Sequence, residues 1–363
     1  MDLSPTQTAA LDEIYAWLAR PHDLEFYLAG YAGTGKTTLA AQLIAETRAR
    51  VCVATLTGKA ASVLRRKGVG QAQTIHSLIY RPIEGTDPIE WGLAADSPLA
   101  YAQLLIVDEI SMVGHDLADD LRSYGKKILV LGDPGQLPPI RGQGAFTSRE
   151  PDVFLSEIHR QAAESPILRL ATMARLGQPI PPSEDPAARV TPLTFNEVLA
   201  APGQLICGTH RARWAITRRV RECDGVIPVA GERVICRRNN HNLGLYNGLL
   251  GTVVEVLDDG SNDDEGRPFL SIKMDDLDAP IVTRVELTPF LEHADGIRRP
   301  HLWRRGVELF DFGYVLTCHS AQGSEWPDVT VVDDSSAFRE EASRWLYTAL
   351  TRASERVTLL NRS

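Results

Sequence analysis

A glycine-rich loop near the N-terminus constrains the fold more than any other feature of this chain. Residues 30–37 read GYAGTGKT, between an apolar run at 26–29 and an amphipathic stretch at 37–49. The spacing fits the pattern G-x-x-x-x-G-K-[ST], whose glycines let backbone N–H groups wrap a phosphate chain at the start of a helix. We therefore expect a strand, a phosphate-binding loop and a helix, which together begin an α/β domain.

Apolar strands and amphipathic helices alternate through the first half of the chain and again after residue 200. This alternation predicts parallel sheets with helices on both faces. Between residues 232 and 287 the texture changes to short strands with Gly- and Asp-containing turns, which predicts a small antiparallel barrel. We expect a first domain at 1–155 with an insertion at 81–99, a second domain at 156–235 and 312–363, and the inserted barrel at 236–311.

Two carboxylates follow the buried apolar run at 104–107, namely Asp108 and Glu109. Ligands of open α/β sheets bind at the carboxyl ends of the strands, where the phosphate loop also lies. Asp108 is then placed to hold Mg²⁺ with the Thr37 hydroxyl, and Lys36 to neutralise the β- and γ-phosphates of ATP. Glu109 is placed to orient or deprotonate the attacking water. These features indicate nucleotide hydrolysis or transfer, and many classes of protein carry them.

Four further segments narrow the class. Residues 132–139 read GDPGQLPP, residues 155–161 LSEIHRQ, residues 317–325 TCHSAQGSE, and residues 347–353 YTALTRA. In this order they resemble motifs III, IV, V and VI of the superfamily 1 helicases. The segment 231–251 resembles the entry to the SH3-like barrel of RecD and Dda relatives, which belong to the 5′-to-3′ branch, superfamily 1B.

The resemblance implies two RecA-like domains that use ATP and Mg²⁺ to move 5′-to-3′ along single-stranded DNA and unwind duplex. It assigns γ-phosphate sensing to Gln136 and places Arg160 and Arg352 on the second domain, with Arg352 as arginine finger. The expected catalytic residues are Lys36, Asp108, Glu109, Gln136, Arg160 and Arg352, and the expected metal ligands Thr37 and Asp108. The expected nucleotide-binding residues are Gln7, Gly30, Gly33, Thr34, Gly35, Lys36, Thr37, Thr38, Gly323 and Glu325.

The same resemblance places single-stranded DNA across both domains. The expected DNA contacts are Thr57, Lys59, Thr74, His76, Thr209, His210, His319 and Gln322. Two positions depart from the family pattern, because Ser320 stands where relatives have Lys and His210 where they have Asn. The insertion at 81–99 occupies the place of the family's strand-separating pin, and our hypothesis is that it acts as the pin, with Trp91 or Ile89 as the stacking residue. The alternative is a packed tryptophan in a surface loop.

Bulk properties fit a protein of this kind. No apolar run approaches the roughly 20 residues that a membrane helix needs, and the first residues lack a secretion signal, so we expect a cytoplasmic protein without a membrane partner. Five scattered cysteines lack the paired spacing of a zinc site or a disulfide framework. We expect a monomer whose partners are single-stranded DNA and duplex junctions. The net charge of −9 does not exclude a basic track on one face, because acidic residues concentrate at 258–278 and arginines at 207–238.

Two other functions remain open at this point. A translocase could hydrolyse ATP on DNA without separating strands, and only a fork substrate distinguishes it from a helicase. A small-molecule phosphotransferase could share the phosphate loop and the carboxylates, but it has no need for motifs III, V and VI. Dependence of ATP hydrolysis on single-stranded DNA separates the DNA-dependent enzymes from the phosphotransferase.

Overall fold

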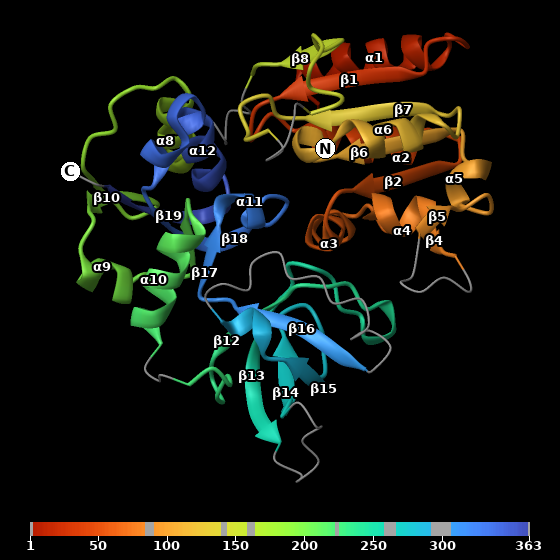
Figure 1. Ribbon diagram of the computed structural model, residues 1–363. Coiled ribbons are helices and arrows are strands. Elements are labelled where there is room, and N and C mark those ends of the chain that lie inside the picture. The colour runs from red at the N-terminus through yellow and green to blue at the C-terminus, as the bar shows by residue number, and fades with distance from the viewer. Residues whose placement is uncertain are drawn as a thin grey trace.

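The computed structural model describes residues 3–83, 91–138, 144–157, 164–221, 225–257, 266–291 and 306–361. Two α/β lobes stand beside each other, and a β-barrel lies against their lower side (Figure 1). The predicted fold class, two lobes with parallel sheets and an inserted barrel, is confirmed. Within the described residues, no helix has both the length and the apolar character that crossing a membrane requires.

The first lobe is built on a parallel sheet of order β3-β2-β6-β7-β1-β8. Successive residues of its apolar strands point to opposite faces, so Tyr27 and Leu28 enter separate cores on the two sides. The strands are β1 (Glu25–Gly30), β2 (Val51–Thr55), β3 (Gln73–Thr74), β6 (Leu104–Asp108), β7 (Lys127–Gly132) and β8 (Val153–Leu155). The helices are α1 (Pro5–Leu18), α2 (Lys36–Glu46), α3 (Gly58–Arg66), α4 (Ile75–Ile79), α5 (Pro98–Tyr101) and α6 (His115–Arg122).

The second lobe repeats this plan with a sheet of order β17-β11-β18-β19-β10-β9, in which only the β9–β10 pair is antiparallel among the described strand pairs. Its strands are β9 (Ser183–Asp185), β10 (Ala188–Pro192), β11 (Gln204–Cys207), β17 (Val315–Thr317), β18 (Trp326–Val332) and β19 (Ala353–Asn361). Its helices are α8 (Pro166–Arg175), α9 (Phe195–Leu199), α10 (His210–Val220), α11 (Cys318–Ala321) and α12 (Ala342–Leu350).

The barrel interrupts the second lobe between β11 and β17. Its strands are β12 (Arg233–Cys236), β13 (Leu250–Leu257), β14 (Phe269–Met274), β15 (Ile281–Glu286) and β16 (Val307–Phe312). Strand β16 was not predicted from the sequence, and it closes the barrel by pairing parallel with β15 and antiparallel with β12. The first barrel strand already begins at Arg233, within the range expected to belong to the second lobe.

The insertion at 81–99 includes part of a hairpin, which lies on the side of the first lobe that faces away from the second lobe (Figure 1). Its strands β4 (Tyr80–Pro82) and β5 (Trp91–Leu93) pair antiparallel. Trp91 is 55% exposed, and Ile83 and Leu93 are each 45% exposed, so apolar side chains cover this hairpin. Ile89, the alternative stacking residue, lies outside the described residues.

Candidate active site between the two lobes

The phosphate loop connects β1 to α2 as the sequence predicts. Gly33 and Gly35 have φ of 79° and 82°, in the left-handed region that favours glycine. At Gly30 a Cβ atom would lie 2.6 Å from the Thr34 Oγ1, so a side chain there would collide with the loop. The Lys36 ammonium donates to the carbonyls of Gly30 and Tyr31 at 2.6 and 3.0 Å, which holds it inside the loop.

Asp108 at the end of β6 faces the start of α2. The Thr37 hydroxyl donates to Asp108 Oδ2 at 3.2 Å, so two hard oxygen donors stand together beside the phosphate loop. Among the described residues no group of three or more His, Cys, Asp or Glu could hold a metal ion. Oxygen donors of this kind suit Mg²⁺, which completes its coordination with water and substrate phosphates. Burial, with the adjacent Glu109 charge, raises the pKa of Asp108 to about 6.

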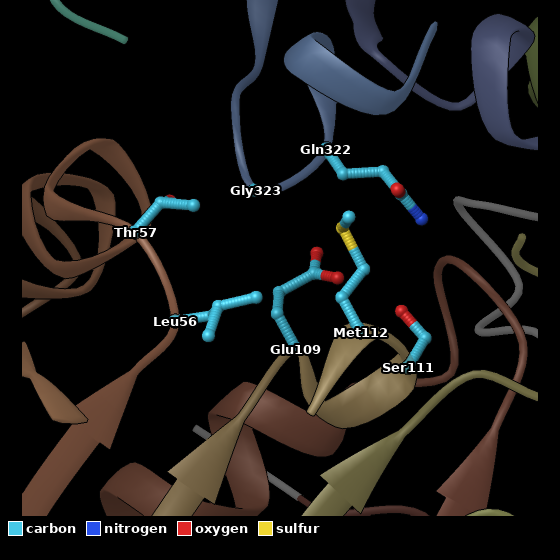
Figure 2. A pocket seen from close by; sticks show the side chains of 7 residues that line it. All are labelled: Leu56, Thr57, Glu109, Ser111, Met112, Gln322 and Gly323. Carbon is cyan, nitrogen blue, oxygen red and sulfur yellow. The ribbon is translucent and has the colours of Figure 1, made fainter. Parts of the chain in front are cut away.

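Glu109 takes an unusual backbone conformation for a non-glycine residue. Its φ of 57° and ψ of 47° are left-handed, and its N–H donates to Asp108 Oδ1 at 2.8 Å. Such strain is found at functional sites, where the surrounding structure holds it. This backbone conformation turns the Glu109 carboxylate toward the second lobe (Figure 2). Glu109 directly precedes the short helix η1 (Ile110–Met112).

Arg352 reaches Glu109 from the second lobe. Its Nη1 lies 3.7 Å from Glu109 Oε1, and the side chain is only 5% exposed. The Gln136 amide, oriented to satisfy its neighbours, donates to Glu109 Oε2 at 3.1 Å and accepts from Arg352 Nη2 at 3.3 Å. The carbonyls of Thr348 and Ser324 accept two further hydrogen bonds from the Arg352 guanidinium. Gln136 thus links the candidate base of one lobe to the candidate arginine finger of the other.

These residues line one cleft of about 700 Å³ between the lobes. The first lobe contributes the phosphate loop, the carboxylates and Gln136. The second contributes Arg352 and the loop after α11. The predicted nucleotide-binding and catalytic residues found in its lining are Gly33, Gly35, Lys36, Thr37, Thr38, Asp108, Glu109, Gln136, Gly323, Glu325 and Arg352.

Other predicted nucleotide-binding residues lie behind this lining. Gln7 is 2% exposed, and its Nε2 donates to the Thr34 carbonyl at 3.1 Å. Its Oε1 accepts from the Ser4 N–H in a capping box at the start of α1, so α1 supports the phosphate loop. Glu325, which does line the cleft, forms an ion pair with Lys67 of the first lobe at 3.1 Å. Arg160, the predicted arginine of motif IV, lies outside the described residues.

Direct hydrogen bonds join the two lobes beside the cleft. The Tyr347 hydroxyl donates to Asp133 Oδ2 at 2.6 Å, and the Ala32 N–H donates to the same hydroxyl at 2.8 Å. The Leu137 N–H donates to Thr348 Oγ1 at 3.0 Å. The lobes are therefore closed on each other through buried polar groups rather than through an apolar interface alone.

A smaller pocket adjoins the cleft on the side of the predicted DNA contacts (Figure 2). Gln322 and Gly323 of the second lobe face Glu109 and Met112, while Thr57 approaches from the end of β2. Glu109 and Gly323 line both this pocket and the cleft. A Cβ at Gly323 would lie 2.9 Å from Thr57 Oγ1, so the lobes touch here with no room for a side chain.

Comparison with known proteins agrees with this geometry. The AAA domain family matches residues 2–182, and the UvrD-like helicase C-terminal domain matches residues 312–360. The ATP-dependent RecD2 DNA helicase of Deinococcus radiodurans is 30% identical in an alignment of 392 residues. That alignment covers 98% of this chain and 48% of the relative, so this chain spans about half the length of that protein.

Solved structures share the fold across the whole chain. The structure of Bacteroides Pif1 bound to single-stranded DNA has a TM-score of 0.62 at 20% identity and covers 99% of this chain and 92% of its own. Pif1 helicase of Candida albicans has a TM-score of 0.56 at 19% identity, with 100% and 96% covered. The chain is therefore similar to a RecD-type helicase over nearly its whole length, and it has the fold of the Pif1 helicases.

Several of the residues that this chain is expected to use for DNA lie at the starts of helices. The hydroxyls of Thr57, Thr74 and Thr209 each accept a backbone hydrogen bond as N-caps of α3, α4 and α10. His76 and His210 are exposed, and His319 is half-buried. Burial and the neighbouring His210 lower the pKa of His319, so the neutral imidazole is favoured.

Two of the predicted DNA contacts are engaged elsewhere. The Lys59 ammonium is bound to Asp276 of the barrel at 2.8 Å, and Lys59 is only 6% exposed. Gln322 is 4% exposed and donates to the Leu137 carbonyl at 3.1 Å, across the lobe interface. In this structure both residues join parts of the protein instead of facing solvent.

Three residues inside the helicase-like segments were assigned no role from the sequence, namely Asp133, Tyr347 and Thr348. Their contacts cross between lobes more than 200 positions apart in the sequence. A tyrosine or threonine hydroxyl inside a motif is a weak signal by itself, because either residue is common in helices. The density of polar side chains in the segment 347–352 is the signal that could have drawn attention to them.

Proposed function

We propose that this chain is an ATP-dependent DNA helicase that moves 5′-to-3′ along single-stranded DNA and unwinds duplex. One observation carries the proposal: Arg352 of the second lobe and Gln136 of the first both contact Glu109 in the cleft that Lys36 lines. A phosphotransferase that acts on a small molecule needs no such shared cleft. Similarity to the RecD2 DNA helicase and the likeness to Bacteroides Pif1, which was solved with single-stranded DNA bound, support DNA as the partner.

The groups in the cleft divide the hydrolysis of ATP among them. Lys36 and the loop N–H groups would hold the β- and γ-phosphates. Thr37 and Asp108 would hold Mg²⁺, which neutralises charge on the phosphates. Glu109 would orient the attacking water and accept its proton, and Arg352 would stabilise the charge that develops on the transferred phosphoryl group. Since the groups come from both lobes, hydrolysis requires a closed cleft.

DNA binding would be coupled to hydrolysis at the shared boundary between cleft and smaller pocket. Glu109 and Gly323 line both the cleft and the smaller pocket, and Thr57 packs against Gly323. Movement of the lobes would therefore shift the helix starts at Thr57 and Thr209 relative to each other. Alternating closure and opening would move the enzyme along the strand as a monomer.

A fork-unwinding assay with opposite tails tests the proposal. We expect strand separation with a 5′ single-stranded tail, none with a 3′ tail, and ATP hydrolysis that depends on single-stranded DNA. The Glu109→Gln variant serves as the inactive control. Hydrolysis without unwinding of either fork would identify a translocase, and hydrolysis independent of DNA would support the phosphotransferase.

The exposed hairpin of β4 and β5 is the proposed wedge at the duplex junction. Its apolar surface, with Trp91 at 55% exposure, offers a face on which a terminal base pair can stack. We expect deletion of 85–95 and the milder Trp91→Ala to abolish or slow strand separation while DNA-stimulated hydrolysis persists. Tyr101→Ala, which changes an aromatic residue 61% exposed elsewhere on the same lobe, is the matched control. Unchanged unwinding by the deletion variant would exclude this role.

A further inference from the structure

One peptide group in the phosphate loop is held from both sides. The peptide that joins Tyr31 to Ala32 accepts a hydrogen bond through its carbonyl from the Lys36 ammonium at 3.0 Å. Its N–H donates to the Tyr347 hydroxyl at 2.8 Å. The peptide therefore connects the phosphate-binding lysine of the first lobe to helix α12 of the second.

Tyr347 is well placed to fix the orientation of this peptide. Its side chain is 2% exposed, and its hydroxyl donates to Asp133 while it accepts from Ala32. A hydroxyl has one proton to donate, so the proton given to Asp133 leaves the oxygen lone pairs to face Ala32. Rotation of the peptide would leave buried polar groups unpaired, which is costly. Burial and the Asp133 charge raise the pKa of Tyr347, so it remains a proton donor at neutral pH.

A second side chain of the same lobe holds the same part of the loop. The Arg175 guanidinium, at the end of α8, lies 3.7 Å from the centre of the Tyr31 ring, in a cation–π contact. The turn at Gly135 packs against both Tyr347 and Arg175. A Cβ atom at Gly135 would lie 3.0 Å from Tyr347 Cε1 and 3.1 Å from Arg175 Cδ. The segment of Tyr31 and Ala32 is thus gripped by two elements of the second lobe.

We propose that the Tyr347 hydroxyl is a positioning group for ATP hydrolysis, which orients the Tyr31–Ala32 peptide, and through it Lys36, when the lobes are closed. The inference rests on the proposed ATPase function. Arg352 lies two residues beyond the end of α12, the helix that carries Tyr347, so the movement that brings the hydroxyl to the loop also brings the guanidinium to Glu109. Lobe closure would in this way place the lysine and the arginine together.

The test is Tyr347→Phe, which removes one oxygen atom and preserves the packing of the ring. We expect kcat of DNA-stimulated hydrolysis to fall about tenfold or more, since one or two buried hydrogen bonds are lost. KM and the dissociation constant for ATP should change less than about threefold, because the N–H donors of the first lobe remain. Tyr314→Phe removes a hydroxyl that donates to the buried Glu232 at 3.4 Å, away from the cleft, and should leave kcat unchanged.

The outcomes are distinct. A kcat of Tyr347→Phe equal to the wild type, or a loss confined to ATP binding, would overturn the inference while the ATPase function stands. A wild-type protein without DNA-stimulated hydrolysis would instead overturn the proposed function. Should Tyr347→Phe melt far below the wild type, Arg175→Gln provides the second probe. It should lower kcat by a smaller factor with ATP binding retained, and an unchanged kcat in Arg175→Gln would also contradict the proposal.

Discussion

The sheets of the two lobes have corresponding strands, but the side chains at the ends of those strands differ. By position in the sheets, β6 of the first lobe corresponds to β18 of the second. After β6, Asp108 faces Thr37 and Glu109 faces Arg352. After β18, Asp334 accepts hydrogen bonds from the N–H and the hydroxyl of Thr209, both at 3.1 Å. The same place in the scaffold therefore holds a candidate catalytic pair in one lobe and a structural brace in the other.

The helix starts, in contrast, are alike. A threonine that caps a helix follows β2 and β11, and a threonine with the same role is the last residue of β3 and of β17. These are Thr57, Thr74, Thr209 and Thr317. The comparison indicates that the capped helix starts proposed to contact DNA are present in both lobes, while the groups proposed to act on the nucleotide are divided between them.

The largest effect is expected where the lobes differ most. Glu109→Gln should lower ATP turnover by about 10²-fold or more, because it removes the candidate general base, while ATP binding persists. Asp334→Asn should mainly lower the melting temperature and leave turnover at saturating DNA within a few-fold of the wild type. Steady-state ATPase and thermal unfolding compare the two. Turnover retained by Glu109→Gln would assign the base elsewhere and remove the contrast.

The ionised carboxylate of Asp108 should lower the free energy of unfolding of the nucleotide-free protein. Its pKa is raised to about 6, so the folded protein holds its proton more tightly than the unfolded chain does. The cost appears as the pH rises from the unfolded value of about 4 and is complete above about 6, where it reaches about 2–3 kcal/mol. Asp108→Asn should therefore stabilise the nucleotide-free protein at pH 8 and not at pH 4.

Thermal unfolding of the two proteins without Mg²⁺ at several pH values measures this difference. Equal stabilisation at pH 4 and pH 8 would show that ionisation is not its cause. For the active enzyme the sign is opposite: turnover should fall in acid, because a protonated Asp108 binds Mg²⁺ poorly.

A smaller effect is expected from substitution of Lys59, which tests whether this residue contacts DNA or only forms an internal ion pair. The pair with Asp276 implies that Lys59→Met leaves the salt dependence of single-stranded DNA binding unchanged. A lysine on a phosphate would lower the slope of log K against log salt by about 0.7. A double-mutant cycle with Asp276→Asn should give a coupling energy of about 1 kcal/mol in unfolding. A reduced slope would return Lys59 to the DNA-binding surface.

Much of the fold and of the cleft was predictable because its signals are local. The phosphate loop, the carboxylates after β6 and the segment 132–139 each follow an apolar strand, and parallel strands bring their carboxyl ends to one edge. The barrel was predicted from turn residues, but β16 was missed. Its partners β12 and β15 lie on either side of it in space and are separated from it in sequence by long connections.

The remaining features depend on contacts that no local pattern encodes. Lys59 reads as a solvent-facing cation, and only the docking of the barrel brings Asp276 to it. Tyr347 has no assigned role in the sequence pattern, and only the closed lobes bring Ala32 and Asp133 to its hydroxyl. Pairings of this kind are set by how the domains meet.

The most direct test of the account is the DNA-stimulated ATPase rate of Arg352→Ala, measured together with its affinity for ATP. If one triphosphate is cleaved by groups from both lobes, turnover should fall by about 10³-fold or more, as for loss of an arginine finger, while ATP still binds to the first lobe. A loss of less than about tenfold would contradict the shared site and leave Arg352 with a structural role.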